Sequence, residues 1–328
     1  MATVRAWCRA DLAGGTLDIW PLGLFHPGAR TVNLALDLAV TVQIEPLPAA
    51  SNYRVSQGES TLSAASLAEL TAAPDGALVG TIAAALDLPP FAATLASESP
   101  RGGGLGASSA MAVALIAAAE EAFDRPRTPA AAKVHLARDL EARLMGLPTG
   151  IQDHYPALLG GVLEIAALPG GERVRSLDVD LEALGGCLLI VYSGQSHFSA
   201  GQNWQVVRRR LDGEAEVTAL FEGIAAVAAA LPAALEAGDW PQVGELVGRE
   251  WSYRRRLADG VSIPQLETLL ERARALGAWG GKACGAGGGG CLAVLGPPDR
   301  RAAIAAAMEE AGGRVLKARP VGPQSHGL

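Results

Sequence analysis

The chain has 328 residues, which is enough for two domains of about 100–200 residues each. Hydrophobic residues make up 49 % and charged residues 19 %, so a sizeable core is available. The net charge of -7 argues against a surface for nucleic acid or for an anionic membrane, either of which would need a basic patch.

Other features of the composition favour a cytoplasmic protein. The first nine residues lack the charged-then-apolar pattern of a signal peptide. We find no stretch of about 18 apolar residues that is free of charge and glycine, and therefore expect no membrane span. The four cysteines form no CxxC pair and are expected to be core thiols in a reducing compartment.

In chain order, the first half is predicted to mix strands and helices. Strands are expected at residues 2–8, at 31–46 as strands around a turn, at 92–97 and at 162–167, with a glycine-rich loop at 9–21. Helices are expected in pieces over 62–88, at 108–123, at 128–145 and, as a short element, at 149–155. Thr128 is the expected N-cap of the third helix, and Gly146 its expected stop.

The second half is predicted to follow a soft boundary within residues 168–186, which contain Pro169 and several glycines. This boundary divides the chain into domains 1–175 and 176–328. Strands are expected at 187–192, 291–295 and 313–318, and helices at 201–211, 214–231, 242–256, 263–276 and 299–311. A glycine cluster occupies 280–290.

A glycine-rich loop between a predicted strand and a predicted helix is the central motif. It comprises Pro100, Arg101, Gly102, Gly103, Gly104, Leu105, Gly106, Ala107, Ser108 and Ser109. Glycines let backbone amides point inward to form an anion-binding concavity, and the following helix adds unpaired N–H groups and the positive end of its dipole. The loop therefore predicts a phosphate site, with a flexible turn without a ligand as the alternative.

Two other phosphate motifs can be excluded for this loop. The Walker pattern fails here because no Lys-Ser or Lys-Thr follows the glycines. It also fails in the glycine cluster at 280–290, where Lys282 is followed by Ala283 and not by Ser or Thr. Gly102 and Gly104 are followed by Gly106 two residues later, whereas the dinucleotide fingerprint needs a spacing of three.

The chain resembles the GHMP kinases, a family that includes galactokinase, homoserine kinase, mevalonate kinase and phosphomevalonate kinase. The loop is similar to that family's second motif, Pro-x-x-x-Gly-Leu-Gly-Ser-Ser, with Ala107 in place of the first Ser. Residues 281–290 resemble the glycine-rich third motif. The resemblance implies an α+β fold of two domains: a ribosomal-protein-S5-like N-terminal domain and a ferredoxin-like C-terminal domain with the active site in the cleft between them.

The first motif points to the sugar-kinase members of the family. Arg9 is followed nine residues later by Asp18, as in galactokinase-like enzymes, and the intervening Ala-Gly-Gly resembles the heptose-phosphate kinase and fucokinase branch. Residues 150–155 (Gly-Ile-Gln-Asp-His-Tyr) also resemble that branch, which usually has Gln where His154 stands.

The resemblance implies catalytic and metal roles for a small set of residues. Asp153 would orient or deprotonate the accepting hydroxyl, and Arg9 would counter the growing negative charge. Ser108 and Glu141, which lies 12 residues before Asp153, would bind the Mg²⁺ of Mg·ATP, since this ion prefers few carboxylates together with phosphate oxygens and water. The alternatives are a helix cap for Asp153, an ion pair for Arg9 and a solvated helix position for Glu141.

Asp18 is the main candidate for binding sugar hydroxyls, because a carboxylate accepts two well-aimed hydrogen bonds; a loop cap is the alternative. Further candidates for the substrate site are Gly14, Gly15, Thr16, Gly150, Gln152, Gly287 and Gly288.

Several other residues stay undecided between a structural and a substrate role. His154 and His197 are within reach of a substrate in principle, although isolated histidines are more often structural. Lys282 either contacts phosphate or faces solvent. Residues 254–256, three consecutive arginines, are typical of a solvated helix face or would receive a phosphate already present on the substrate.

The predicted function is transfer of the γ-phosphate of ATP to a hydroxyl of a sugar or sugar phosphate. The alternatives are a kinase of a non-sugar alcohol such as mevalonate or homoserine, and a non-catalytic sensor of sugar and ATP on the same scaffold. The expected cofactors are ATP and Mg²⁺. We expect the protein to be a monomer or a homodimer.

Overall fold

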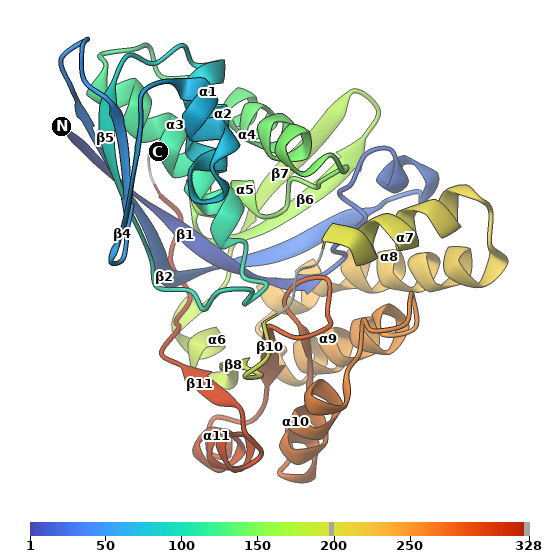
Figure 1. Cartoon of the computed structure of the whole chain (residues 1–328). Helices are drawn as coiled ribbons and strands as arrows, with labels where there is room; N and C mark the ends of the chain where they lie inside the picture. The colour runs from blue at the N-terminus through green and yellow to red at the C-terminus, as the bar shows by residue number, and fades with distance from the viewer. Residues whose placement is uncertain (197–199, 325–328) are drawn as a thin grey trace.

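The computed structural model describes residues 1–196 and 200–324, which form two β-sheets covered by helices (Figure 1). The large sheet contains β1 (Ala2–Ala13), β2 (Arg30–Pro46), β3 (Tyr53–Gln57), β4 (Ser60–Ala64), β5 (Phe91–Ser97), β6 (Val162–Leu168) and β7 (Gly171–Leu177). The small sheet contains β8 (Leu188–Tyr192), β9 (Gly280–Ala283), β10 (Cys291–Leu295) and β11 (Arg314–Leu316).

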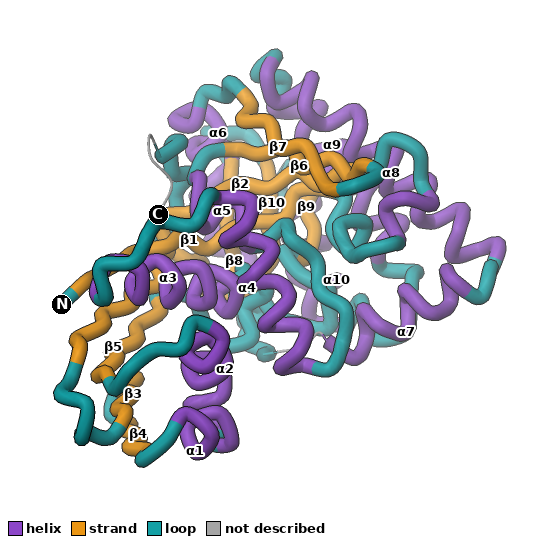
Figure 2. The backbone as a smooth tube through the Cα atoms, turned by 90° about the horizontal axis from the view of Figure 1, so that it is seen from above, coloured by secondary structure: helices purple, strands orange, loops and turns teal. Residues whose placement is uncertain are grey.

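The helices pack on both sheets and between them (Figures 1 and 2). They are α1 (Leu67–Ala72), α2 (Ala77–Ala85), α3 (Ala107–Ala122), α4 (Ala130–Met145), α5 (His154–Leu159), α6 (Leu181–Cys187), α7 (Ala200–Leu211), α8 (Ala215–Glu236), α9 (Trp240–Arg254), α10 (Pro264–Ala275) and α11 (Arg301–Glu310). Short 3-10 turns occur at Leu22–Phe25 and Pro74–Gly76. α3 and α5 pack on β1 and β2, whereas α9 contacts β1 of the large sheet and β9 and β10 of the small one.

The long strand β2 organises the large sheet. It pairs with β1 along one edge and, along the other, with β6 near its start and β5 near its end. The β1–β2 register shifts between Trp7 and Cys8 and between Asp11 and Ala13. Bulges re-aim side chains locally, and here they lie on either side of Arg9 and Asp11.

Helix α3 is buried along most of its length because its residues are mainly small. Twelve of its 16 residues are buried, and half of these are alanines that allow close approach to the sheet. One of the twelve, Glu120, lies 2.9 Å through its Oε2 from Nζ of Lys133 on α4. This buried ion pair joins α3 to α4, which pack against each other.

Several predicted elements are confirmed and several are wrong. Helix α4 ends at Gly146, which adopts the left-handed conformation with φ of 65° as its C-cap. Its N-cap is Pro129, not Thr128, and it makes no side-chain capping bond. Residues 31–46 form one strand without a turn, and β1 runs through Arg9 to Ala13, so Arg9 lies on a strand and not in a loop.

The predicted linker at 168–186 contains β7 and α6, and residues 62–64, expected to be helical, belong to β4. β7 extends across residue 175, while the division into domains at that residue stays a prediction. Among the described residues one helix, α8, is long and apolar enough to cross a membrane, and 56 % of its most apolar window is buried inside the protein. Such burial is typical of the core helix of a soluble protein.

Candidate active site

The glycine-rich loop follows β5 and ends at the first residue of α3. Gly102, Gly104 and Gly106 have φ values of 63°, 69° and 70°, a region that costs most other residues energy. Gly106 is the N-cap of α3, so the first amides of this helix have no partners within it. The loop therefore presents backbone N–H groups and the positive end of the α3 dipole to the cavity above it, which suits an anion.

Residues 281–290, the third glycine-rich segment, pack against this loop from the other half of the chain. The N–H of Cys291 donates to the carbonyl oxygen of Gly103 at 2.8 Å. A Cβ atom on Gly290 would lie 2.9 Å from the same oxygen, and one on Gly285 would lie 3.1 Å from Cα of Gly104. Glycine at these positions lets the two segments pack backbone to backbone.

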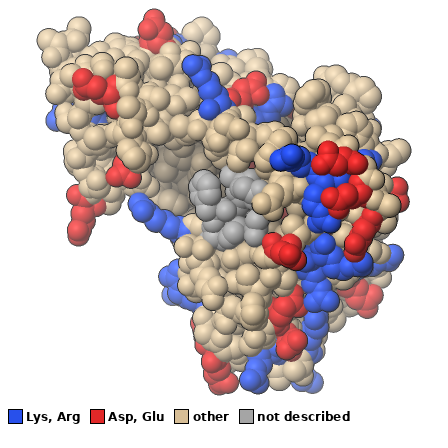
Figure 3. All heavy atoms as spheres, turned by 45° about the vertical axis from the view of Figure 1, so that its right-hand side comes forward, with Lys and Arg blue, Asp and Glu red and all other residues tan. Residues whose placement is uncertain are grey.

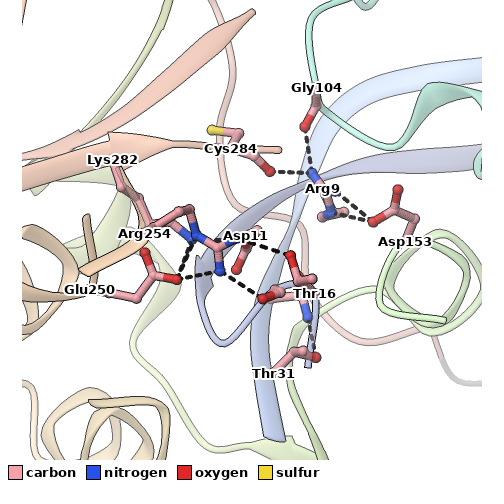
Figure 4. Close-up of polar contacts among 12 residues, drawn as sticks. Arg9, Asp11, Thr16, Thr31, Gly104, Asp153, Glu250, Arg254, Lys282 and Cys284 are labelled. Carbon is pink, nitrogen blue, oxygen red and sulfur yellow. Dashed lines mark hydrogen bonds and ion pairs between the residues drawn. The ribbon is translucent and has the colours of Figure 1, made fainter. Parts of the chain in front are cut away.

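Arg9 joins the three regions that the sequence singles out (Figure 4). Its Nε and Nη2 donate to Oδ1 of Asp153 at 2.8 and 2.5 Å. Its Nη1 donates to the carbonyl oxygens of Gly104 at 2.6 Å and of Cys284 at 2.8 Å. One guanidinium thus holds the loop, the third glycine-rich segment and the candidate catalytic carboxylate together.

The environment keeps the Arg9 guanidinium charged. Burial disfavours the charged form of Arg9, but the carboxylates of Asp153 and Asp11 outweigh this effect and raise its pKa. Arg9 is 3 % exposed, whereas the Asp153 side chain is 27 % exposed. Asp153 thus faces the cavity, and its Oδ2 has no hydrogen bond from any residue that the structure describes. It makes no helix-capping bond at the start of α5, so the alternative of a cap does not describe it.

A second carboxylate lies on the other side of the loop. Ser108 donates through Oγ to Oε1 of Glu141 at 2.7 Å, and His154 Nε2 lies 2.7 Å from Oε2 of the same carboxylate. Burial alone would raise the pKa of Glu141, but the hydrogen bonds from His154 and Ser108 lower it below its ordinary value. The carboxylate is therefore ionised and held on both sides, and it is not a solvated helix residue.

Asp18 contacts the segment that contains Asp153. Its Oδ2 accepts the backbone N–H groups of Ile151 at 2.7 Å and of Gln152 at 2.9 Å. A Cβ atom on Gly150 would lie 1.9 Å from this oxygen, so only glycine fits beside it. Burial raises the pKa of Asp18 to about 6, against the lowering effect of the two amides. The loop-capping contact is thus present, and a role in substrate binding stays a prediction.

A buried ionic network lies beside Arg9 and involves Asp11, Thr16, Glu250, Arg254 and Lys282 (Figure 4). Lys282 on β9 places Nζ 2.8 Å from Oδ2 of Asp11 and 3.3 Å from Oε1 of Glu250. Arg254 donates through Nη2 to Glu250 Oε1 at 2.6 Å and to the Gly15 carbonyl oxygen at 2.7 Å, and through Nη1 to Thr16 Oγ1 at 3.2 Å. Lys282 does not face solvent and Arg254 does not lie on a solvated face, since both are buried.

Most of the predicted site residues line one cavity of about 1070 Å³. They are Arg9, Thr16, Asp18, Pro100, Gly102, Gly103, Gly104, Leu105, Gly106, Ala107, Ser108, Ser109, Glu141, Gly150, Gln152, Asp153 and Gly287. Gly14, Gly15 and Gly288 are predicted but do not line it. Asp11 lines it and was not predicted, because its position depends on contacts across the whole chain. Arg254 also lines it; the sequence left this residue open between a solvated helix face and a contact with a phosphate on the substrate.

A second cavity, of about 520 Å³, adjoins the first. Asp18, Ile19, Pro148 and Thr149 line both, so these residues form the wall between the cavities. The second cavity is otherwise walled mainly by apolar side chains such as Leu17 and Ile165, with exposed Trp20 at its rim.

The cysteines contribute no nucleophile to the site. All four are free and buried, as predicted. Burial raises the pKa of Cys284, beside Arg9, to about 12, and that of Cys8 to about 12. His197 lies outside the described residues. Among those that are described, no group of three or more His, Cys, Asp or Glu could hold a metal ion by itself.

The chain matches two parts of one family. Residues 76–161 match the GHMP kinases N terminal domain, and residues 230–314 match the GHMP kinases C terminal domain. A mevalonate kinase of Methanothermobacter thermautotrophicus is 30 % identical over 231 residues, which are 67 % of this chain and 70 % of that protein. The L-fucokinase/L-fucose-1-P guanylyltransferase of Bacteroides fragilis is 26 % identical over 92 % of this chain.

A D-glycero-D-manno-heptose 1-phosphate kinase from Bacteroides thetaiotaomicron has the same fold, with a TM-score of 0.78 at 21 % identity over 100 % of this chain and 99 % of that one. The chain therefore belongs to the GHMP kinase family and has its α+β fold of two domains. It spans 35 % of the Bacteroides fragilis protein and 60 to 65 % of several other curated relatives.

Proposed function

We propose that the chain transfers the γ-phosphate of ATP to a hydroxyl of a sugar or sugar phosphate. The observation that carries this proposal is the Arg9–Asp153 pair, which lies between the anion-binding loop and Asp18 in one cavity. Phosphoryl transfer requires positioning, neutralisation of charge and an oriented nucleophile, and these three parts supply them.

The residues around Ser108 fit Mg·ATP. The loop and the start of α3 would hold the phosphates, while Glu141 and the Ser108 hydroxyl would bind the ion together with phosphate oxygens and water. One carboxylate and one hydroxyl suit an ion that dehydrates reluctantly and is held jointly with the nucleotide. The bound ion would neutralise charge on the phosphates.

On the acceptor side, Asp153 would accept the proton of the attacking hydroxyl or fix its direction. Arg9 would hold Asp153 in place and balance negative charge next to the loop. Gln152 Oε1 is buried and has no hydrogen-bond partner among the described residues, so it is available to a hydroxyl of the acceptor. Asp18 would accept hydroxyl hydrogen bonds through the oxygen that the backbone amides leave free.

The relatives favour two acceptor classes. Fucokinase, heptose kinase and galactokinase relatives support a sugar, and the Asp18 segment agrees with it. Mevalonate kinases of similar or higher identity support a non-sugar alcohol as the second candidate. A sensor without activity has less support, because Arg9, Ser108 and Asp153 all lie in position around one cavity.

An ADP-release assay over a panel of sugars, sugar phosphates, mevalonate and homoserine tests this proposal. We expect activity with one class of sugar, and a fall in kcat of about 10²–10⁴-fold in Asp153→Asn, which keeps size but removes the charge. Circular dichroism and unchanged affinity for an ATP analogue are the controls for folding. Activity with mevalonate alone would support the second candidate. If no acceptor of either class gave ADP release, both candidates would be contradicted.

We also propose that this chain acts on small molecules in the cytoplasm. We expect it to be a monomer or a homodimer and not to bind nucleic acid. On the face that Figure 3 shows, basic and acidic side chains intermingle instead of forming an extended basic patch. Gel filtration and a filter-binding assay with nucleic acid would test these expectations.

A further inference from the structure

His154 is the first residue of α5 and directly follows Asp153. The two neighbours have different partners, because Asp153 accepts from Arg9 whereas His154 contacts Glu141. A carboxylate only accepts hydrogen bonds when it is ionised, so His154 Nε2 is the donor in this pair. The first turn of α5 therefore holds the candidate catalytic carboxylate and also touches the candidate metal carboxylate.

The burial of His154 shows that packing alone does not account for a histidine here. The side chain is 0 % exposed, and its Nδ1 has no hydrogen-bond partner among the described residues. A buried polar atom without a partner costs free energy, and an apolar side chain of similar size would avoid that cost. The contact that an apolar residue could not make is the one from Nε2 to Glu141.

The geometry at Glu141 explains what this contact achieves. The last torsion of a glutamate side chain is broad, so an unsupported carboxylate rotates freely. Here Ser108 holds Oε1 and His154 holds Oε2, each at 2.7 Å, and each oxygen keeps a further lone pair. The carboxylate is thus fixed in one orientation before any ligand arrives.

We propose that His154 is a positioning residue that orients Glu141 toward the metal of the metal–nucleotide complex. The inference rests on the proposed function, since Glu141 has a metal to bind only if the chain uses Mg·ATP. Groups that hydrogen-bond to a metal ligand orient it and raise the affinity for the metal, and their removal typically costs about 10- to 100-fold in metal affinity or activity.

The test uses three variants and titration calorimetry with a non-hydrolysable ATP analogue, with Mg²⁺ and with EDTA. His154→Leu removes the donor, and His154→Gln keeps an amide donor at similar reach. His26→Leu is the matched control, because His26 is also a buried histidine, its ring Nε2 is bonded to Arg210, and it does not line the cavity.

We expect His154→Leu to weaken analogue binding in Mg²⁺ by about 10- to 100-fold and to leave binding in EDTA unchanged. His154→Gln should stay within a few-fold of the unmodified chain, and His26→Leu should change only the melting temperature. If His154→Leu does not fold, His154→Asn replaces it, since its amide is too short to reach Glu141.

Two outcomes have distinct meanings. If Mg²⁺ improves analogue binding by the same factor in the unmodified chain and in His154→Leu, His154 does not position Glu141. An equal loss in Mg²⁺ and in EDTA would also overturn the inference, because it indicates a general structural role. If Mg²⁺ does not improve binding even in the unmodified chain, the proposed use of Mg·ATP fails instead.

Discussion

Asp18 combines a structural contact with a proposed substrate contact, and the two place opposite demands on its charge. Two backbone amides stabilise the carboxylate, but burial outweighs them and raises its pKa from 3.8 to about 6. A group whose pKa is raised by folding contributes stability that is complete below its unfolded pKa and is lost as the pH rises through its folded pKa. The charged form needed for hydroxyl binding is therefore the form that weakens the fold.

This linkage predicts that Asp18→Asn stabilises the protein at high pH and weakens acceptor binding. The amide oxygen of Asn still accepts from Ile151 and Gln152, but it carries no buried charge. We expect the variant to melt at a higher temperature than the unmodified protein at pH 8. At pH 5 this difference should be smaller, because Asp18 is then largely protonated. Thermal unfolding over this range measures it, and a difference that does not change with pH would contradict it.

Acceptor kinetics give the second readout for the same variant. Removing one partner of hydrogen bonds to a charged group costs about 1.5–3 kcal/mol, so KM for the acceptor should rise by roughly 10- to 150-fold while KM for ATP changes little. Equal changes in both constants would assign Asp18 to loop capping alone.

For single residues, the sequence identified those candidates that lie in short motifs. Ser108 and Asp153 were named as site candidates because neighbouring glycines or a fixed spacing mark them, and both line the cavity. The pairing of Lys282 with Asp11 was not predicted, because 271 residues separate the two partners and nothing local to either one indicates the other. The burial of Arg254 was not evident for a related reason, since the run of three arginines at 254–256 gives no sign that its first member is buried.

Among the elements, the glycine-rich loop at 100–109 depends on residues 285–291, which it meets only in the folded chain. Gly290 on that segment has φ of 77° and would place a Cβ 2.9 Å from the Gly103 oxygen. Gly290→Ala should displace the loop, and we expect kcat/KM for ATP to fall by roughly 10- to 100-fold, since small misplacements of reacting groups have effects of this size.

Gly277→Ala provides the matched control. Gly277 also has a positive φ, of 92°, but a Cβ there would meet no atom within 4 Å. Both substitutions introduce left-handed backbone strain of about 1–2 kcal/mol, and only the first presses on the loop. Steady-state kinetics at varied ATP should separate them, and a similar loss in both variants would assign the effect to backbone strain.

Strand and helix predictions failed where tertiary pairing decides the conformation. Residues 9–13 contain charges and precede two glycines, which is typical of a loop, yet pairing with β2 keeps them in β1. Thr128 precedes a proline in a good capping pattern, but its backbone N–H is bound to Glu120 of α3, and the helix starts at Ala130 with Pro129 as its N-cap. In both cases a contact from another element outweighs the local preference.

For the whole molecule, the network of Asp11, Glu250, Arg254 and Lys282 joins the large sheet to α9 and β9. Burial would raise the pKa of Asp11, but Lys282, Arg254 and Arg9 outweigh it and lower the pKa. Lys282→Met removes the cation that Asp11 and Glu250 share. Breaking a buried ion pair costs about 3–5 kcal/mol, so we expect a loss of this order in the free energy of unfolding.

Asp11→Asn and the double variant complete the cycle. Because the two residues interact directly, the double variant should lose less than the sum of the single losses, by about 0.5–3 kcal/mol. Urea unfolding followed by fluorescence and circular dichroism provides these values. Strictly additive losses would show that the pair contributes no coupling between the sheets.

Under the proposed function, the wall between the two cavities would let acceptor choice evolve separately from phosphoryl transfer. Asp18, Ile19, Pro148 and Thr149 separate the proposed acceptor side of the larger cavity from the smaller one, and none of them contacts Arg9 or the Ser108 hydroxyl through a hydrogen bond described above. After a gene duplication, smaller residues at Ile19 or Thr149 would join the two spaces and admit bulkier alcohols. The machinery that handles ATP would be inherited intact, so new substrates can arise here without a new catalyst.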